Sequence, residues 1–124
     1  MRIFRVENND KQGMYTANGP SFWTLTEGEA SDVHPMPFQD SRLVDACEGI
    51  GLDAGCLPSD YRFGFRSIQQ MRQWLYQDHW LQYLHDNGFH LSEYSVAEDH
   101  YAIGHTQAVF STEHAIKVAE HSLV

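Results

Sequence analysis

In the stretch YRFGFRSIQQMRQWLYQDHWLQYL, residues 61–84, a strand pattern gives way to a helix pattern. Its first residues, 61–65, are rich in aromatic side chains, which is typical of a short strand. Ser67 is followed three residues later by Gln70, the signature of a capping box at the start of a helix. The stretch therefore predicts a strand that leads directly into a helix.

The helix predicted after Ser67 spans residues 68–86. Its apolar residues recur at helical spacing, and Asn87-Gly88 is a typical C-terminal stop. Asp78 is a candidate second cap, so the prediction includes a break near Gln77. The residues of the stretch that we expect in the core are Phe63, Phe65, Ile68, Met71 and Leu75.

Two more helices are predicted outside this stretch. The first covers residues 41–48, with Asp40 or Ser41 as its N-cap and Gly49 as its stop. The second covers residues 112–122 and is capped by Ser111 or Thr112. Its expected apolar stripe consists of Ala115, Ile116, Ala119 and Leu123.

Alternating apolar and polar residues predict further strands. These are expected over residues 2–7, 14–17, 89–96, 100–104 and 106–110, with a bulge near Ser92. Clustered strands combined with helices indicate an α+β fold with a mainly antiparallel sheet and about three helices, in a single domain over residues 1–124.

Residues 17–40 interrupt this pattern with a high density of glycine and proline, which predicts a long irregular segment. Long ordered loops of this kind are often functional. The apolar residues of the segment that we expect to pack onto the core are Phe22, Trp23, Met36 and Phe38.

The charge balance limits the kinds of partner. Eight Lys and Arg face seventeen Asp and Glu, for a net charge of −9, so direct nucleic-acid binding does not fit. No run of about eighteen apolar residues is present, so no membrane segment is expected. We expect a cytoplasmic protein with Cys47 and Cys56 as free thiols.

The sequence lacks the motifs of common active sites. It contains no Gly-x-Ser-x-Gly and no phosphate-binding glycine loop at a strand–helix junction. The eight histidines are not spaced as metal ligands; His114 and His121, for example, lie two helical turns apart. No metal, cofactor or catalytic residue is therefore assigned from the residues themselves.

Charge is distributed unevenly along the chain, since no Lys or Arg occurs between Gln73 and Ile116. An acidic half of this kind is either a solvated surface or a face that binds a basic protein surface. If the acidic half binds a basic protein surface, aromatic side chains beside the carboxylates would serve as anchors. The residues predicted to bind such a partner are Tyr76, Tyr83, Asp78, Asp86 and Glu93.

Three segments resemble a set of small phage and prophage proteins that have no settled function. They are RIFRVENNDKQGMYT at the start, FGFRSIQQMRQWL in the middle and TQAVFSTEHA near the end. The resemblance implies an accessory protein of a mobile element that acts inside the host cell. Combined with the acidic half, it favours a protein that binds and modulates a host or defence protein.

A second resemblance is to ADP-ribosyltransferases, which use a first-strand arginine, a serine at a strand–helix junction and a late glutamate. Arg5, Ser67 and Gln107 occur here in that order. The resemblance implies that NAD is the ligand, and that an amide at Gln107 stabilises a cationic centre poorly, so that binding occurs without catalysis. Arg66 joins these three as a candidate ligand-binding residue, since a pocket arginine at that junction suits an anion.

Overall fold

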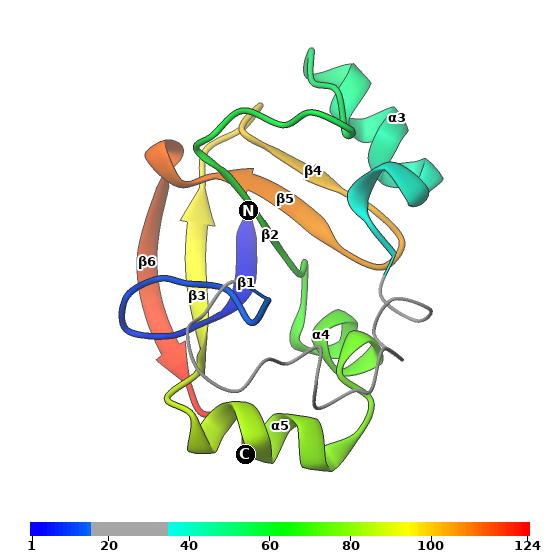
Figure 1. Cartoon of the computed structure of the whole chain (residues 1–124). Helices are drawn as coiled ribbons and strands as arrows, with labels where there is room; N and C mark the ends of the chain where they lie inside the picture. Colours follow the sequence, from blue (N-terminus) through cyan, green and yellow to red (C-terminus); the bar gives the residue numbers. More distant parts are fainter. Residues whose placement is uncertain (16–34) are drawn as a thin grey trace.

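The computed structural model in Figure 1 describes residues 1–15 and 35–124. Three α-helices and six strands make up most of this part of the chain. In chain order the elements are β1 (Arg2–Glu7), the 3-10 turn η1 (Pro37–Gln39), α3 (Ser41–Gly49), β2 (Tyr61–Gly64), α4 (Ile68–Trp74), α5 (Asp78–Asp86), β3 (His90–Val96), β4 (Tyr101–Ile103), β5 (Ala108–Ser111), the 3-10 turn η2 (Thr112–His114) and β6 (Ala115–His121). The predicted α+β class with antiparallel strands is confirmed.

The six strands form two antiparallel sheets of three strands each (Figure 1). One sheet has the order β1-β3-β6 and the other the order β2-β5-β4. The sheets meet where Phe4 and Phe65 exchange two backbone hydrogen bonds of 2.7 Å. The ends of β1 and β2 are therefore held side by side, and residues near both strands can line one site.

Gly64 makes this junction sterically feasible. A Cβ atom at residue 64 would lie 2.6 Å from the backbone oxygen of Phe4 and 3.0 Å from a methyl group of Ile3. Backbone at that distance cannot move aside as a flexible side chain would. The absence of a side chain at Gly64 therefore permits β1 to approach β2.

The main apolar cluster lies between the strand junction and the two central helices. It includes Phe65, Trp74, Leu75, Trp80, Leu81, Leu84 and Leu91. All of these residues except Leu91 come from the stretch at 61–84, in which the strand pattern gives way to the helix pattern. In Figure 1, α4 and α5 lie at the same end of the molecule, below β2 and across the ends of β3 and β6.

Asp40 joins α3 to the turn between β4 and β5. Its carboxylate accepts hydrogen bonds from the backbone N–H of Leu43, as an N-cap, and from the N–H groups of His105 and Thr106. Burial acts to raise the pKa of Asp40, but these hydrogen bonds outweigh burial and lower it below its usual value. The predicted N-cap is thus confirmed. The same carboxylate also holds the start of α3 against the turn between β4 and β5.

The predicted break in the central helix is confirmed. α4 ends at Trp74 and α5 begins at Asp78, so Gln77, rather than Asp78, occupies the N-cap position. Ser67 caps α4 by accepting a hydrogen bond from the N–H of Gln70. The capping box is incomplete, because the side chain of Gln70 accepts from the N–H of Arg66 instead of Ser67.

The predicted final helix over 112–122 is wrong. Residues 112–114 form the 3-10 turn η2, and Ala115–His121 form strand β6, which pairs antiparallel with β3. Ile116 is 72% exposed, so the expected apolar stripe does not exist. Pairing with β3 satisfies the backbone hydrogen-bonding groups of this segment. This tertiary contact outweighs the weak helical spacing of its apolar residues.

Other expectations failed at single positions. Met14 and Tyr15 lie in a turn, so the predicted strand at 14–17 is not formed at these residues. Ile68 is 40% exposed, and Met36 and Phe38 are also exposed rather than packed on the core. Phe22 and Trp23, with most of the segment predicted as irregular, fall outside the described residues.

The remaining strand predictions hold to within one or two residues. The strand at 2–7 matches β1, and the register of β3 with β6 shifts between Glu93 and Tyr94, close to the bulge expected near Ser92. Cys47 is buried, Cys56 is exposed, and both are free.

We predict that Gly64→Ala destabilises the protein by about 2 kcal/mol or more, because the new methyl group overlaps the backbone of β1. Urea unfolding measures the loss. The matched control is Gly49→Ala at the end of α3, where a Cβ meets nothing within 4 Å. This control should be neutral or stabilising by about 0.5–1 kcal/mol. Equal stability of the two variants would contradict the tight junction.

Candidate functional site

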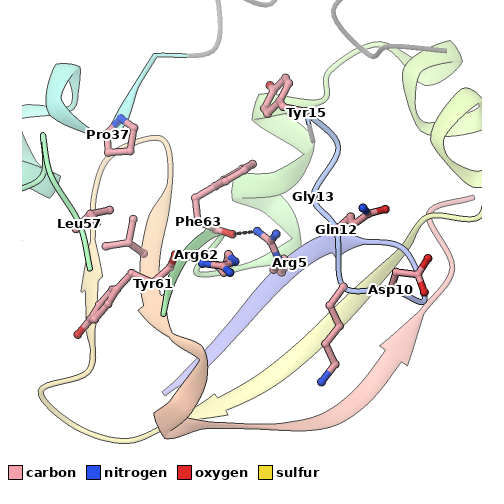
Figure 2. A pocket seen from close by; sticks show the side chains of 12 residues that line it. Arg5, Asp10, Gln12, Gly13, Tyr15, Pro37, Leu57, Tyr61, Arg62 and Phe63 are labelled. Carbon is pink, nitrogen blue, oxygen red and sulfur yellow. Dashed lines mark hydrogen bonds between the residues drawn. The ribbon is translucent and has the colours of Figure 1, made fainter. Parts of the chain in front are cut away.

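A cavity of about 580 Å³ opens beside the junction of β1 and β2. It is lined by Arg5 from β1, by the loop Asp10–Gly13 and Tyr15, and by Tyr61, Arg62 and Phe63 from β2. Figure 2 shows these side chains around the cavity. Aromatic and aliphatic groups make up one wall, so we refer to this cavity as the aromatic lobe.

A second cavity of about 420 Å³ adjoins the first. The two share four lining residues, namely Arg5, Asp10, Lys11 and Arg62. The other residues of the second cavity are mostly polar or charged: Glu7, Tyr94, Thr112, Glu113, Ala115 and Lys117. We call it the polar lobe, and the two lobes together the cleft.

Positive charge is concentrated in the cleft. Arg5, Lys11, Arg62 and Lys117 line it, and they are four of the eight Lys and Arg residues of the chain. Three of them come from distant parts of the sequence, on β1, β2 and β6. Glu7, Asp10 and Glu113 also line the cleft, so in a protein of net charge −9 its charged side chains give a small positive excess.

Arg5 is the most deeply buried of these cations, with 5% of its surface exposed. Its Nε lies 3.2 Å from Oε1 of Glu7, and its Nη1 donates a 2.8 Å hydrogen bond to the carbonyl of Phe63 (Figure 2). Its guanidinium also lies 5.6 Å from the centre of the Phe63 ring. The side chain is thus held rigidly at the wall that both lobes share.

Glu7 is the counterion of Arg5 and is 1% exposed. Its Oε2 accepts hydrogen bonds of 2.7 Å from Oγ of Ser92 and from the hydroxyl of Tyr94. Burial, followed by the bond to Glu7, raises the pKa of Tyr94, so that this hydroxyl stays protonated and donates at neutral pH. Burial lowers the pKa of Arg5, and the charge of Glu7 opposes that change.

Tyr15 and Phe63 form the ring-lined part of the aromatic lobe. Their rings stack with centroids 6.0 Å apart, and Nε1 of Trp74 donates a 3.0 Å hydrogen bond to the Tyr15 hydroxyl. Burial raises the pKa of Tyr15. A flat apolar group could be accommodated beside these rings while its charged part contacts Arg5 and Arg62.

The loop over residues 8–13 closes one side of the cleft. The side chain of Asn8 accepts hydrogen bonds from the N–H groups of Asp10 and Gln12, and Lys11 adopts a positive φ of 60°. A Cβ at Gly13 would lie 2.9 Å from Nη2 of Arg5. The glycine lets the loop pass directly over the buried guanidinium.

The residues predicted to bind a ligand separate in space. Arg5 is buried at the cleft. Ser67 caps α4, Arg66 is exposed, and Gln107 is buried with its Nε2 donating to the carbonyl of Pro35. Arg66, Ser67 and Gln107 are not among the described residues that line either lobe.

The residues predicted to bind a partner lie mainly on α5. Asp78 and Asp86, at its two ends, are exposed, and Tyr83 is half-buried against the core. Tyr76, between α4 and α5, is 48% exposed. Glu93 lies apart from this group, on β3. Its Oε2 lies 3.6 Å from Nε of Arg2, and its Oε1 lies 2.9 Å from Nε2 of His121.

Three cations of the cleft were not predicted as site residues from the sequence. They are Lys11, Arg62 and Lys117. Arg66 is the arginine expected to bind an anion at this strand–helix junction, but Arg62, on β2, lines the cleft instead. Lys117 was assigned to a helix, and as part of β6 it instead reaches the polar lobe.

A comparison with family models identifies the chain. The model described as Bacteriophage T4 Y00F protein matches residues 1–124. The chain belongs to this family. No curated protein and no solved structure matches this Y00F-family protein. The expected relation to phage proteins is confirmed, while the likeness to ADP-ribosyltransferases stays a prediction.

Two further properties concern the described part of the Y00F-family protein. None of its helices is both long and apolar enough to pass through a membrane. Among residues 1–15 and 35–124, no group of three or more His, Cys, Asp or Glu side chains is placed to hold a metal ion.

We predict that Glu7→Gln destabilises this Y00F-family protein by about 3 kcal/mol, because it leaves the buried charge of Arg5 without a counterion. Urea unfolding at pH 7 measures the change. Glu120→Gln is the control, since Glu120 pairs with Lys117 at an exposed position and its loss should leave the free energy of unfolding nearly unchanged. A small effect of Glu7→Gln would show that the Arg5–Glu7 pair does not hold the cleft wall.

Proposed function

We propose that this phage accessory protein binds a small organic phosphate that carries a flat ring, with NAD as the representative ligand. The observation that supports this is the convergence of four cations on a cleft with an aromatic wall, in a protein that is otherwise strongly acidic. The phosphates would contact Arg5, Lys11 and Arg62, and a ring would occupy the aromatic lobe.

The dimensions and rigidity of the cleft support a small ligand. Pockets for small molecules usually measure about 300–1,000 Å³, and both lobes fall in that range. Arg5 is already fixed by Glu7 and Phe63, so binding would cost it little side-chain entropy. The loop covers most of this guanidinium at Gly13, so an anion would contact it only at its small exposed part and would depend more on Lys11 and Arg62.

NAD is chosen because the resemblance to ADP-ribosyltransferases assigns this role to Arg5. The residues present fit the phosphates and a ring of NAD, through the buried arginine and the stacked Tyr15 and Phe63. Gln107 does not fit a catalytic role, because it is a buried amide whose Nε2 donates to Pro35. We therefore propose binding, without transfer of ADP-ribose.

Isothermal titration with NAD at low salt tests the proposal. Arg62→Ala should weaken binding about tenfold, since it removes a charge-assisted contact to phosphate. Arg42→Ala is the control, because it removes the same charge from the exposed surface of α3. Added salt should weaken binding further. The absence of heat with NAD, or equal weakening by the two variants, would refute a ligand site in the cleft.

A second candidate is the binding of a host or defence protein that has a basic surface. Tyr76 supports it, because an aromatic side chain that is 48% exposed lies next to the exposed Asp78 and could serve as an anchor. The proposed surface consists of Tyr76, Asp78, Tyr83 and Asp86. Glu93 contributes less, because its carboxylate already contacts Arg2 and His121.

Pull-down from host lysate tests this second candidate. Asp86→Lys and Tyr83→Ala should each reduce recovery of a specific partner several-fold. Glu48→Lys on α3 is the matched control, since it makes the same charge change at an exposed position elsewhere. If the wild type and all three variants recover every protein equally, α5 is not the binding surface.

A further inference from the structure

We propose that Glu120 and His90 are positioning residues for the cleft, because they control how much of the charge of Lys117 is available to a bound anion. When His90 is neutral, Glu120 holds the ammonium group of Lys117. When His90 is protonated, it competes for Glu120 and releases Lys117 to the polar lobe. The inference rests on the proposed function and adds to it a dependence on pH.

The small positive excess of the cleft depends on Lys117. Four Lys or Arg and three Asp or Glu side chains line the two lobes, so four positive charges against three negative ones leave an excess of one. Lys117 lines the polar lobe, and its charge is one of the four. If a carboxylate outside the cleft neutralises Lys117, the excess disappears. The pairing of this lysine therefore determines how strongly the cleft attracts an anion.

Lys117 is held by groups that do not line the cleft. Its Nζ donates a 2.7 Å hydrogen bond to Oε1 of Glu120 and lies 3.4 Å from Nε2 of His90. Glu120 and His90 line a separate cavity of about 350 Å³, together with His85 and His121. Lys117 thus lies at the border between this cavity and the polar lobe, and its ammonium group is bonded to residues of the cavity.

A single carboxylate oxygen serves both Lys117 and His90, because Oε1 of Glu120 also lies 3.1 Å from Nε2 of His90. In a neutral imidazole Nε2 can accept a hydrogen bond from Lys117, whereas in the imidazolium it can only donate. Protonation of His90 therefore adds a competitor for Glu120 and places a positive charge beside the ammonium group. Both changes favour movement of Lys117 toward the polar lobe.

The other titratable groups around His90 are already paired or exposed to solvent. Glu7 lies opposite His90 in the register of β1 with β3, but its carboxylate is bound within the wall of the cleft. Nε2 of His121 on β6 contacts Glu93. His85, in the last turn of α5, is exposed. The charge of His90 therefore acts mainly on its two contacts on β6.

Isothermal titration with NAD at low salt and pH 8, where ordinary histidines are neutral, tests whether Glu120 restrains Lys117. Glu120→Gln should tighten binding about threefold, because an amide holds an ammonium group less strongly than a carboxylate does. In a Lys117→Gln background the same change should have no such effect. Glu98→Gln is the control, since it removes a negative charge from the exposed turn between β3 and β4.

Titration at pH 5.5, where ordinary histidines are mostly protonated, tests the role of His90. The diphosphate of NAD keeps its charge at this pH, and the hydrogen bond from Lys117 lowers the pKa of Glu120, so this carboxylate stays ionised. The wild type should bind NAD about threefold more tightly than at pH 8, as expected for partly exposed charges. His90→Gln should lose most of this gain, and His79→Gln, an exposed control on α5, should keep it.

The outcomes separate this inference from the proposed function. If NAD binds to neither the wild type nor Glu120→Gln, the proposed function fails and the inference fails with it. If NAD binds, but Glu120→Gln does not tighten binding or tightens it equally in the Lys117→Gln background, only the inference is overturned. A gain at pH 5.5 that persists in His90→Gln would likewise overturn the part assigned to His90.

Discussion

The structure depends on the close contact of β1 with the end of β2. Phe4 and Phe65 exchange backbone hydrogen bonds there, and Gly64 leaves space for the approach. This contact is a backbone bridge between the two three-stranded sheets, which also pack on each other through Tyr94 and Phe110. It also places the guanidinium of Arg5 against the carbonyl of Phe63, and so creates the wall shared by both lobes of the cleft.

The cleft concentrates scarce positive charge in an acidic protein. Burying an arginine and a glutamate costs desolvation energy, which an ion pair repays only when the remaining polar atoms are satisfied. Ser92 and Tyr94 meet that condition for Glu7, whereas Nη2 of Arg5 has no acceptor in the described residues. Within the described residues no buried side-chain nitrogen or oxygen lacks a hydrogen-bond partner, so the donor capacity that Nη2 retains lies at the exposed part of the guanidinium.

Charge along the chain predicts an acidic half, but the neighbours of each carboxylate in space determine whether its charge is exposed. Asp78 and Asp86 are exposed on α5, but Glu93 contacts Arg2 and His121 from other strands. A one-signed run of sequence therefore does not become a one-signed surface at every position. Both proposed sites could operate on one molecule, because α5 and the cleft use different residues.

The amino-acid sequence by itself determined the α+β class, the strand at 2–7, the cap at Asp40 and the interruption of the central helix. These features depend on local patterns, in which a side chain acts on backbone within a few residues. Tertiary structure alone decided that 115–121 is a strand, because its backbone pairs with β3. It alone also brought Arg5, Lys11, Arg62 and Lys117 to one cleft, because strand pairing joins segments that lie more than a hundred residues apart. Spacing along the chain carries no information about this proximity.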